Sequence, residues 1–107
     1  MSTRLPGKAY KAVFDQGRSA RGRFVVAWQM KCANADRMAG VVVSKRIFHD
    51  AVDRNRAKRL MREAFRLLVK EEAIDRETWW VFVARGAIIN VKCAEVMKDI
   101  KKICARF

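Results

Sequence analysis

The chain has 107 residues, with 24 Lys or Arg against 11 Asp or Glu, a formal net charge of +13 and a pI near 10.6. Its length fits a single domain over residues 1–107, and a hydrophobic fraction of 51% argues against disorder. So large an excess of positive charge favours a polyanionic partner, either nucleic acid or an anionic membrane surface. No apolar run approaches the roughly 20 residues of a membrane-spanning helix, and the N-terminus lacks the apolar region of a secretory signal. We therefore expect a cytoplasmic protein with no membrane partner.

The hydrophobic pattern predicts three helices and three strands, in the order helix, strand, strand, helix, strand, helix. In chain order they cover residues 6–16, 23–29, 38–44, 50–68, 78–84 and 90 to about 106. A loop of small polar residues at 32–37 separates the first two strands, which are expected to pair antiparallel across it. Asn90 is expected to cap the final helix.

The helix predicted over residues 50–68 carries the densest positive charge. Its segment DRNRAKRLMREAFR has Lys or Arg at six of fourteen positions. At about 100° per residue, one face is apolar and is expected to pack on a core. The opposite face consists of Asn55, Lys58, Arg59, Arg62 and Arg66, flanked by Arg54 and Arg56.

Two features of this cationic face favour nucleic acid over a plain solvated surface. A solvated helix usually alternates charge at i, i+4, whereas no acid is expected between Asn55, Arg59, Arg62 and Arg66. Arginine, which holds phosphate through two hydrogen bonds, outnumbers lysine five to one in the segment. The pattern therefore predicts contact with RNA or DNA.

No residue pattern typical of protein catalysis or of a metal site is found. His49 is the only histidine and has no Ser or Cys placed to act with it. Cys32, Cys93 and Cys104 are widely spaced and form no CxxC pair, so reduced thiols are expected rather than zinc ligands. We expect no catalytic side chain and no metal held by the protein alone.

The central motif resembles the signature of the bacterial ribonuclease P protein subunit. In that family a strand ending in Ser-Lys-Lys/Arg precedes Ala-Val and then Arg-Asn-x-x-Lys-Arg-x-x-Arg on a helix. The matching residues here are Ser44, Lys45, Arg46, Ala51, Val52, Arg54, Asn55, Lys58, Arg59 and Arg62. YKAVFDQG is similar to the family's first helix, and WVFVARGA is similar to its last strand with the following Arg85.

The resemblance implies an α+β fold. This would be a two-layer α/β sandwich with a central, mostly antiparallel sheet, three helices and a left-handed βαβ crossover, as in a ribosomal protein domain. It also implies a non-catalytic subunit of an endoribonuclease, which binds a catalytic RNA and assists removal of the 5′ leader of precursor tRNA. Mg²⁺ would sit at the RNA partner, and no further protein partner would be required.

The resemblance also implies site residues. Those implied or predicted to bind RNA are Lys45, Arg46, Arg54, Asn55, Arg56, Lys58, Arg59, Arg62, Arg66 and Arg85. A cleft between the first helix and the sheet would bind the single-stranded leader through Tyr10, Phe14 and Phe24, because aromatic faces stack on unpaired bases.

Two stretches depart from the family pattern. IFHD, at 47–50, stands where many members carry Gly and Lys, so His49 and Asp50 lower the positive charge there. Ala27 stands where the family often has an aromatic residue, with Trp28 beside it.

Three other functions stay open at this point. A non-enzymatic RNA-binding protein of ribosomal type is the main alternative. A helix-turn-helix DNA-binding factor needs a second short helix beside the recognition helix, and strands are predicted there instead. A membrane-surface helix would need the apolar face that the core requires.

Overall fold

The computed structural model describes residues 4–107 and has the predicted α+β architecture, with four strands in one mixed sheet. The elements are α1 (Ala9–Gln16), β1 (Arg18–Arg21), β2 (Val25–Lys31), β3 (Met38–Val42), α2 (Ala51–Lys70), β4 (Thr78–Ala84), the 3₁₀ helix η1 (Gly86–Asn90) and α3 (Cys93–Cys104). The predicted long helix and last strand are confirmed almost to the residue.

The sheet has the strand order β1-β2-β4-β3, with β1–β2 and β2–β4 antiparallel and β3–β4 parallel. The predicted pairing of the second strand with the first across the 32–37 loop is therefore wrong, because β4 lies between β2 and β3. So short a loop usually joins two paired strands. Here β4 pairs between them instead, because β4 is apolar on both faces and is buried best at the centre of the sheet. β3, α2 and β4 form the βαβ crossover that the resemblance implies.

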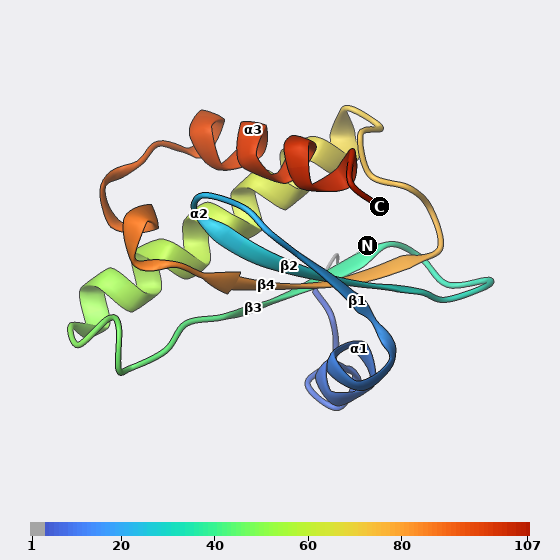
Figure 1. Cartoon of the computed structure of the whole chain (residues 1–107), viewed down its shortest axis with the longest axis horizontal. Coiled ribbons are helices and arrows are strands. Elements are labelled where there is room, and N and C mark those ends of the chain that lie inside the picture. The colour runs from blue at the N-terminus through green and yellow to red at the C-terminus, as the bar shows by residue number, and fades with distance from the viewer. Residues whose placement is uncertain (1–3) are drawn as a thin grey trace.

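Helices cover both faces of the sheet (Figure 1). α2 and α3 pack together on one face over the main core, which contains Phe65, Trp80 and Phe82. The short helix α1 lies on the other face, over a smaller cluster with Val13 and Val81 at its centre. Alternate residues of β2, β3 and β4 belong to the two clusters, as the pleat requires.

Two further differences from the predicted elements have local causes. β1 was not predicted because RSAR lacks the β-branched and aromatic residues that mark strands; its hydrogen bonds to β2 make it an edge strand. Asn90 does not cap the last helix but ends η1. α3 starts at Cys93, and the Glu95 carboxylate accepts a hydrogen bond from the backbone N–H of Lys92 at 3.0 Å.

The turn between β1 and β2 is held against α3 by a buried carboxylate. Asp99 accepts hydrogen bonds from the backbone N–H groups of Arg23, Phe24 and Val25, at 2.8, 2.9 and 3.2 Å. Gly22 is needed beside it, since a Cβ at that position would lie 2.4 Å from the carboxylate. Sequence periodicity could not find this contact, because an acid on the apolar face of a helix interrupts the pattern rather than marking a role.

Candidate nucleic-acid interface

The cationic face of α2 points away from the core, as predicted. Met61, Ala64 and Leu68 are buried, whereas Asn55, Arg56, Arg59, Arg62 and Arg66 are exposed and Lys58 is half-buried. We call Asn55, Lys58, Arg59, Arg62 and Arg66 the α2 ridge. One continuous helix of twenty residues holds these side chains in register over about three turns.

A groove of about 480 Å³ runs beside the α2 ridge, between this helix and β3. Its lining residues are Arg4, Ala39, Asn55, Lys58, Arg59, Arg62, Glu63, Phe65 and Arg66. Arg4 reaches this place because residues 4–5 pair with the outer edge of β3: Arg4 forms a parallel bridge with Ala39, and Leu5 N–H donates to the Ala39 carbonyl at 2.9 Å. Cations from two distant parts of the chain thus line one hollow.

One acid enters the α2 ridge, contrary to the expectation. Glu63 forms two hydrogen bonds with Arg66, of 2.6 Å to Nη2 and 3.1 Å to Nε. The bonds to Arg66 lower the pKa of the Glu63 carboxyl, and the same bonds raise the pKa of the guanidinium. At about 100° per residue Glu63 lies at the border of the cationic face, beside Arg56, and it pairs instead with Arg66, three residues further on.

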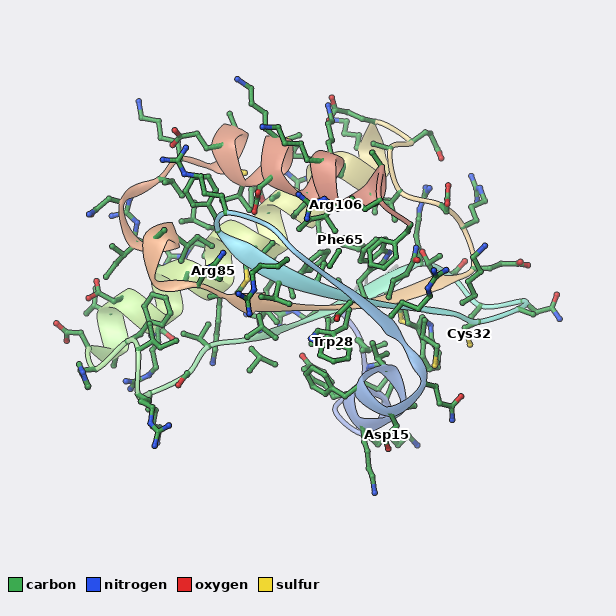
Figure 2. All side chains as sticks on the ribbon, viewed as in Figure 1. Asp15, Trp28, Cys32, Phe65, Arg85 and Arg106 are labelled. Atoms are coloured by element: carbon green, nitrogen blue, oxygen red, sulfur yellow. The ribbon has the colours of Figure 1, made fainter. Side chains whose placement is uncertain are left out.

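Three predicted RNA-binding residues lie outside the helix α2. Lys45 and Arg46 are exposed in the segment between β3 and α2. Arg85 is half-buried, and its Nη1 donates to the Gly22 carbonyl at 2.7 Å, beside the β1–β2 turn (Figure 2).

Arg54 is held at the start of α2. Its Nη1 donates to the carbonyls of Phe48 and His49, at 2.9 and 3.0 Å. Arg54 therefore fixes the loop that leads into the helix, in addition to any contact with a partner.

Two of the three residues predicted for a leader cleft, Tyr10 and Phe14, lie on the side of α1 that packs on the sheet. Tyr10 lies against Gly40, and its hydroxyl accepts a hydrogen bond from Val41 N–H at 3.1 Å. Phe14 meets Trp28 edge to face, with ring centroids 5.3 Å apart. Tyr10, Phe14 and Trp28 are all half-buried, so each keeps part of its ring at the surface.

Phe24 is not part of this aromatic surface. It is 8% exposed and belongs to the core under α2 and α3, with the Arg23 guanidinium 5.4 Å from its ring centre. Its backbone is fixed by Asp99, so its position supports a structural role.

Trp28 stands next to Ala27, the position at which the family often has an aromatic residue. Ala27 faces α2 and α3, and Trp28 faces α1; Figure 2 shows Trp28 on the opposite side of the sheet from Phe65. Trp79 lies on the same face as Trp28, with its Nε1 buried and without a hydrogen-bond partner in residues 4–107. The alternation of residues in β2 and β4 was the signal that could have found both tryptophans.

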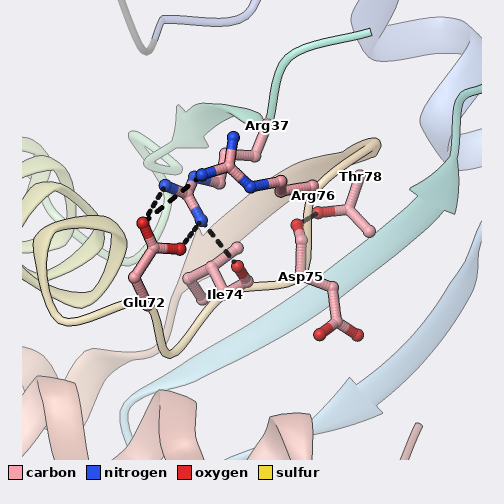
Figure 3. A network of polar contacts seen from close by, with 6 residues as sticks. All are labelled: Arg37, Glu72, Ile74, Asp75, Arg76 and Thr78. Carbon is pink, nitrogen blue, oxygen red and sulfur yellow. Dashed lines mark hydrogen bonds and ion pairs between the residues drawn. The ribbon is translucent and has the colours of Figure 1, made fainter. Parts of the chain in front are cut away.

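An acid-rich turn follows α2 and is neutralised from within the protein (Figure 3). Arg37 donates to both carboxylate oxygens of Glu72, at 2.9 and 3.3 Å, and to the Ile74 carbonyl at 3.0 Å. These bonds lower the pKa of Glu72 and raise that of Arg37. In the described part of the chain no group of three or more His, Cys, Asp or Glu is arranged to hold a metal ion.

The fold and this surface define an RNA-binding α+β domain, with a guanidinium-rich helix on one side and a partly exposed aromatic surface on the other. The family model for ribonuclease P matches residues 5–107. The chain therefore belongs to the ribonuclease P protein family. Of the helices between residues 4 and 107, none is both long and apolar enough to cross a membrane.

Curated relatives and solved structures agree with this assignment. The chain is 36% identical to the ribonuclease P protein component of an Exiguobacterium strain over 97 residues, which is 91% of this chain and 82% of the relative. That of Caldanaerobacter subterraneus is 36% identical over 94 residues, covering 88% and 78%. The RNase P protein of Thermotoga maritima has a similar fold, with a TM-score of 0.81 and 23% identity over 97% of this chain and 96% of that one.

Proposed function

We propose that the chain is the protein subunit of a bacterial ribonuclease P, the endoribonuclease that matures tRNA, and that it binds the catalytic RNA through the α2 ridge. The observation that carries this proposal is the opposition of two faces on α2, one buried and one arginine-rich along a groove. Guanidinium groups at this spacing neutralise phosphates of a folded RNA. The ribosomal alternative is not favoured, since the family match spans nearly the whole chain.

Leader binding is the second part of the proposal. The surface formed by Tyr10, Phe14 and Trp28 offers aromatic rings to unpaired bases, which stack on such rings with little sequence preference. The exposed Lys8 and Lys11 of the α1 region lie beside them in sequence and supply charge for the leader backbone. We therefore place the 5′ leader of precursor tRNA on the α1 side of the sheet.

Chemistry belongs to the RNA in this proposal. Mg²⁺ is bound by phosphate oxygens with one or two further ligands and water, and the phosphates come from the RNA partner. The work of the protein is to reduce phosphate repulsion, raise metal occupancy at the RNA and hold the leader. We place this work in the cytoplasm, with precursor tRNA as the substrate.

Reconstitution tests this function. Purified chain added to a bacterial ribonuclease P RNA at low Mg²⁺ should restore cleavage of the tRNA leader, which a ribosomal RNA-binding protein should not do. The double variant Arg59→Ala/Arg62→Ala should require more protein for the same rate and flatten the salt dependence by about one unit or less per lost phosphate contact. Failure of the unaltered chain to restore cleavage would refute the proposal.

The leader site has its own pair of variants. Tyr10→Ala should weaken binding of precursor tRNA more than binding of mature tRNA, because only the precursor has bases to stack. Tyr10→Phe keeps the ring and should retain the preference for the leader, although it leaves Val41 N–H without its acceptor. Equal losses on both RNAs for Tyr10→Ala would return this residue to a purely structural role.

A further inference from the structure

A second cationic surface lies at the opposite edge of the sheet from the α2 ridge. It consists of Arg18 on β1, Arg23 in the β1–β2 turn, Lys98 and Lys102 on α3, and Arg106 just after α3, and we call it the α3 edge surface. All five side chains belong to exposed residues. β1 is the edge strand on the side away from β3, so this surface and the α2 ridge face different parts of any partner.

The charges of the α3 edge surface are uncompensated. None of its five residues forms an ion pair with an acid within residues 4–107. Lys98 and Lys102 stand at i, i+4 on α3, a spacing at which like charges destabilise a helix by a few tenths of a kcal/mol per pair. The neighbouring acids are occupied elsewhere: Asp99 holds three backbone N–H groups and Glu95 caps the helix.

Two structural contacts make this surface one rigid unit. Asp99 ties α3 to the β1–β2 turn through its three hydrogen bonds. Arg106 Nη1 donates to the Arg21 carbonyl at 2.5 Å, which joins the end of α3 to β1 (Figure 2). The elements that carry these cations are therefore fixed relative to one another, so no backbone ordering is needed when a polyanion binds.

The chemistry of this surface differs from that of the α1 side. Its aromatic neighbours are packed: Phe24 is buried under Arg23, and Phe107 lies edge-on against Trp80, with ring centroids 5.6 Å apart. No ring among the described residues of this surface is free to stack on a base. Positive charge without stacking suits the phosphate backbone of paired RNA, which proteins recognise by shape and charge rather than by base edges.

We propose that the α3 edge surface binds the backbone of a double-helical RNA segment, at a site separate from both the α2 ridge and the aromatic α1 surface. This inference rests on the proposed function, because the duplex would belong to the same catalytic RNA. The chain then contacts that RNA at two edges of its sheet, and two separate RNA segments are needed to reach both.

The experiment uses two double variants with the same residue type and the same loss of charge. Lys98→Gln/Lys102→Gln removes charge from the α3 edge surface. Lys70→Gln/Lys101→Gln is the control, since both lysines are exposed and lie outside the α3 edge surface, and Lys101 is turned towards Glu71 at the end of α2, 3.9 Å away. Binding to a ribonuclease P RNA is measured over a salt series, with footprinting of the RNA. A short RNA duplex and a single strand of equal length serve as competitors.

The α3 edge variant should bind the catalytic RNA about tenfold more weakly than the control at near-physiological salt, with a salt slope lower by one to about two units. In the footprint, the α3 edge variant should no longer protect paired RNA positions that Arg59→Ala/Arg62→Ala still protects. The short duplex should also compete less well for the α3 edge variant than for the control. Equal binding of the catalytic RNA by the two lysine variants overturns the inference. So does a result in which the duplex and the single strand lose the same amount of competing power with the α3 edge variant. If the α3 edge inference fails in this way while the unaltered chain still restores cleavage in the reconstitution, the proposed function stands.

Discussion

At the scale of single residues, Glu63 sets how much of the α2 ridge is available to phosphate. Its carboxylate takes two of the hydrogen-bond donors of Arg66, and it also lines the groove in which a phosphate would lie. Exposed ion pairs of this kind contribute little to stability, because water and salt screen them. Its effect on the charge of the groove is therefore larger than its effect on the fold.

Glu63→Gln should strengthen binding to ribonuclease P RNA several-fold and steepen the salt dependence by up to about 0.9 units, because Arg66 becomes free to contact a phosphate. A salt titration measures both quantities. Glu71→Gln is the matched control: it removes the same charge from an exposed residue at the end of α2, outside the groove. Weaker binding by Glu63→Gln would mean that the ion pair positions Arg66 for RNA instead of occupying it.

At the scale of secondary-structure elements, the sequence predicts what local patterns encode. α2 was found because its apolar and basic residues separate cleanly at the helical period, and β4 because it is a continuous run of large apolar residues. β1 was missed because RSAR lacks strand-forming residues, although its partner β2 is the next strand in the chain. The β3–β4 pairing was missed because it joins strands that are far apart in the chain. β3 and β4 can pair in parallel only because α2 connects them across the sheet, and the length of the 32–37 loop does not reveal this connection.

Asp99 shows what such a long-range contact contributes between elements. Asp99→Asn replaces an acceptor of three hydrogen bonds by a group with one oxygen acceptor and an amide that faces N–H donors. We expect a loss of about 3 kcal/mol in the free energy of unfolding, measured in urea, because buried N–H groups lose their acceptor. The β1–β2 turn should also show faster amide hydrogen exchange.

Glu95→Gln is the control for that measurement, since it alters an exposed acid on the same helix that accepts one N–H. Its cost should stay near 1 kcal/mol or below. If the two variants differ by less than about 0.5 kcal/mol, Asp99 is not the clamp between α3 and the β1–β2 turn.

The candidate site was predictable only in part, because a local pattern encodes the α2 ridge but not the arrangement of strands in the sheet. The α2 ridge follows from helical spacing alone, so Asn55, Arg59 and Arg62 lie where the sequence placed them. The aromatic surface depends on which face of the sheet each strand residue occupies, and that excluded Phe24 and brought in Trp28.

At the scale of the whole molecule, the charge is arranged at the expense of stability. The net charge is +13, yet acids concentrate in the turn after α2, where Arg37 and Arg76 meet Glu72. The α2 ridge and the α3 edge surface are left with almost no counter-charge at two edges of one sheet. A free chain of this kind repels itself, and a bound polyanion relieves the repulsion.

The free chain should therefore become more stable as salt screens this repulsion. Between 0.02 and 0.3 M NaCl the Debye length falls from roughly 20 Å to about 6 Å, shorter than the separation of charges across the molecule. A gain of about 1 kcal/mol would raise Tm by about 4–8 °C in a domain of this size, measured by thermal melts followed by circular dichroism. Lys98→Gln/Lys102→Gln, which starts with less repulsion, should show a smaller rise than the unaltered chain. A Tm that stays constant or falls with salt in the unaltered chain would mean that its internal ion pairs outweigh the repulsion between its cationic surfaces.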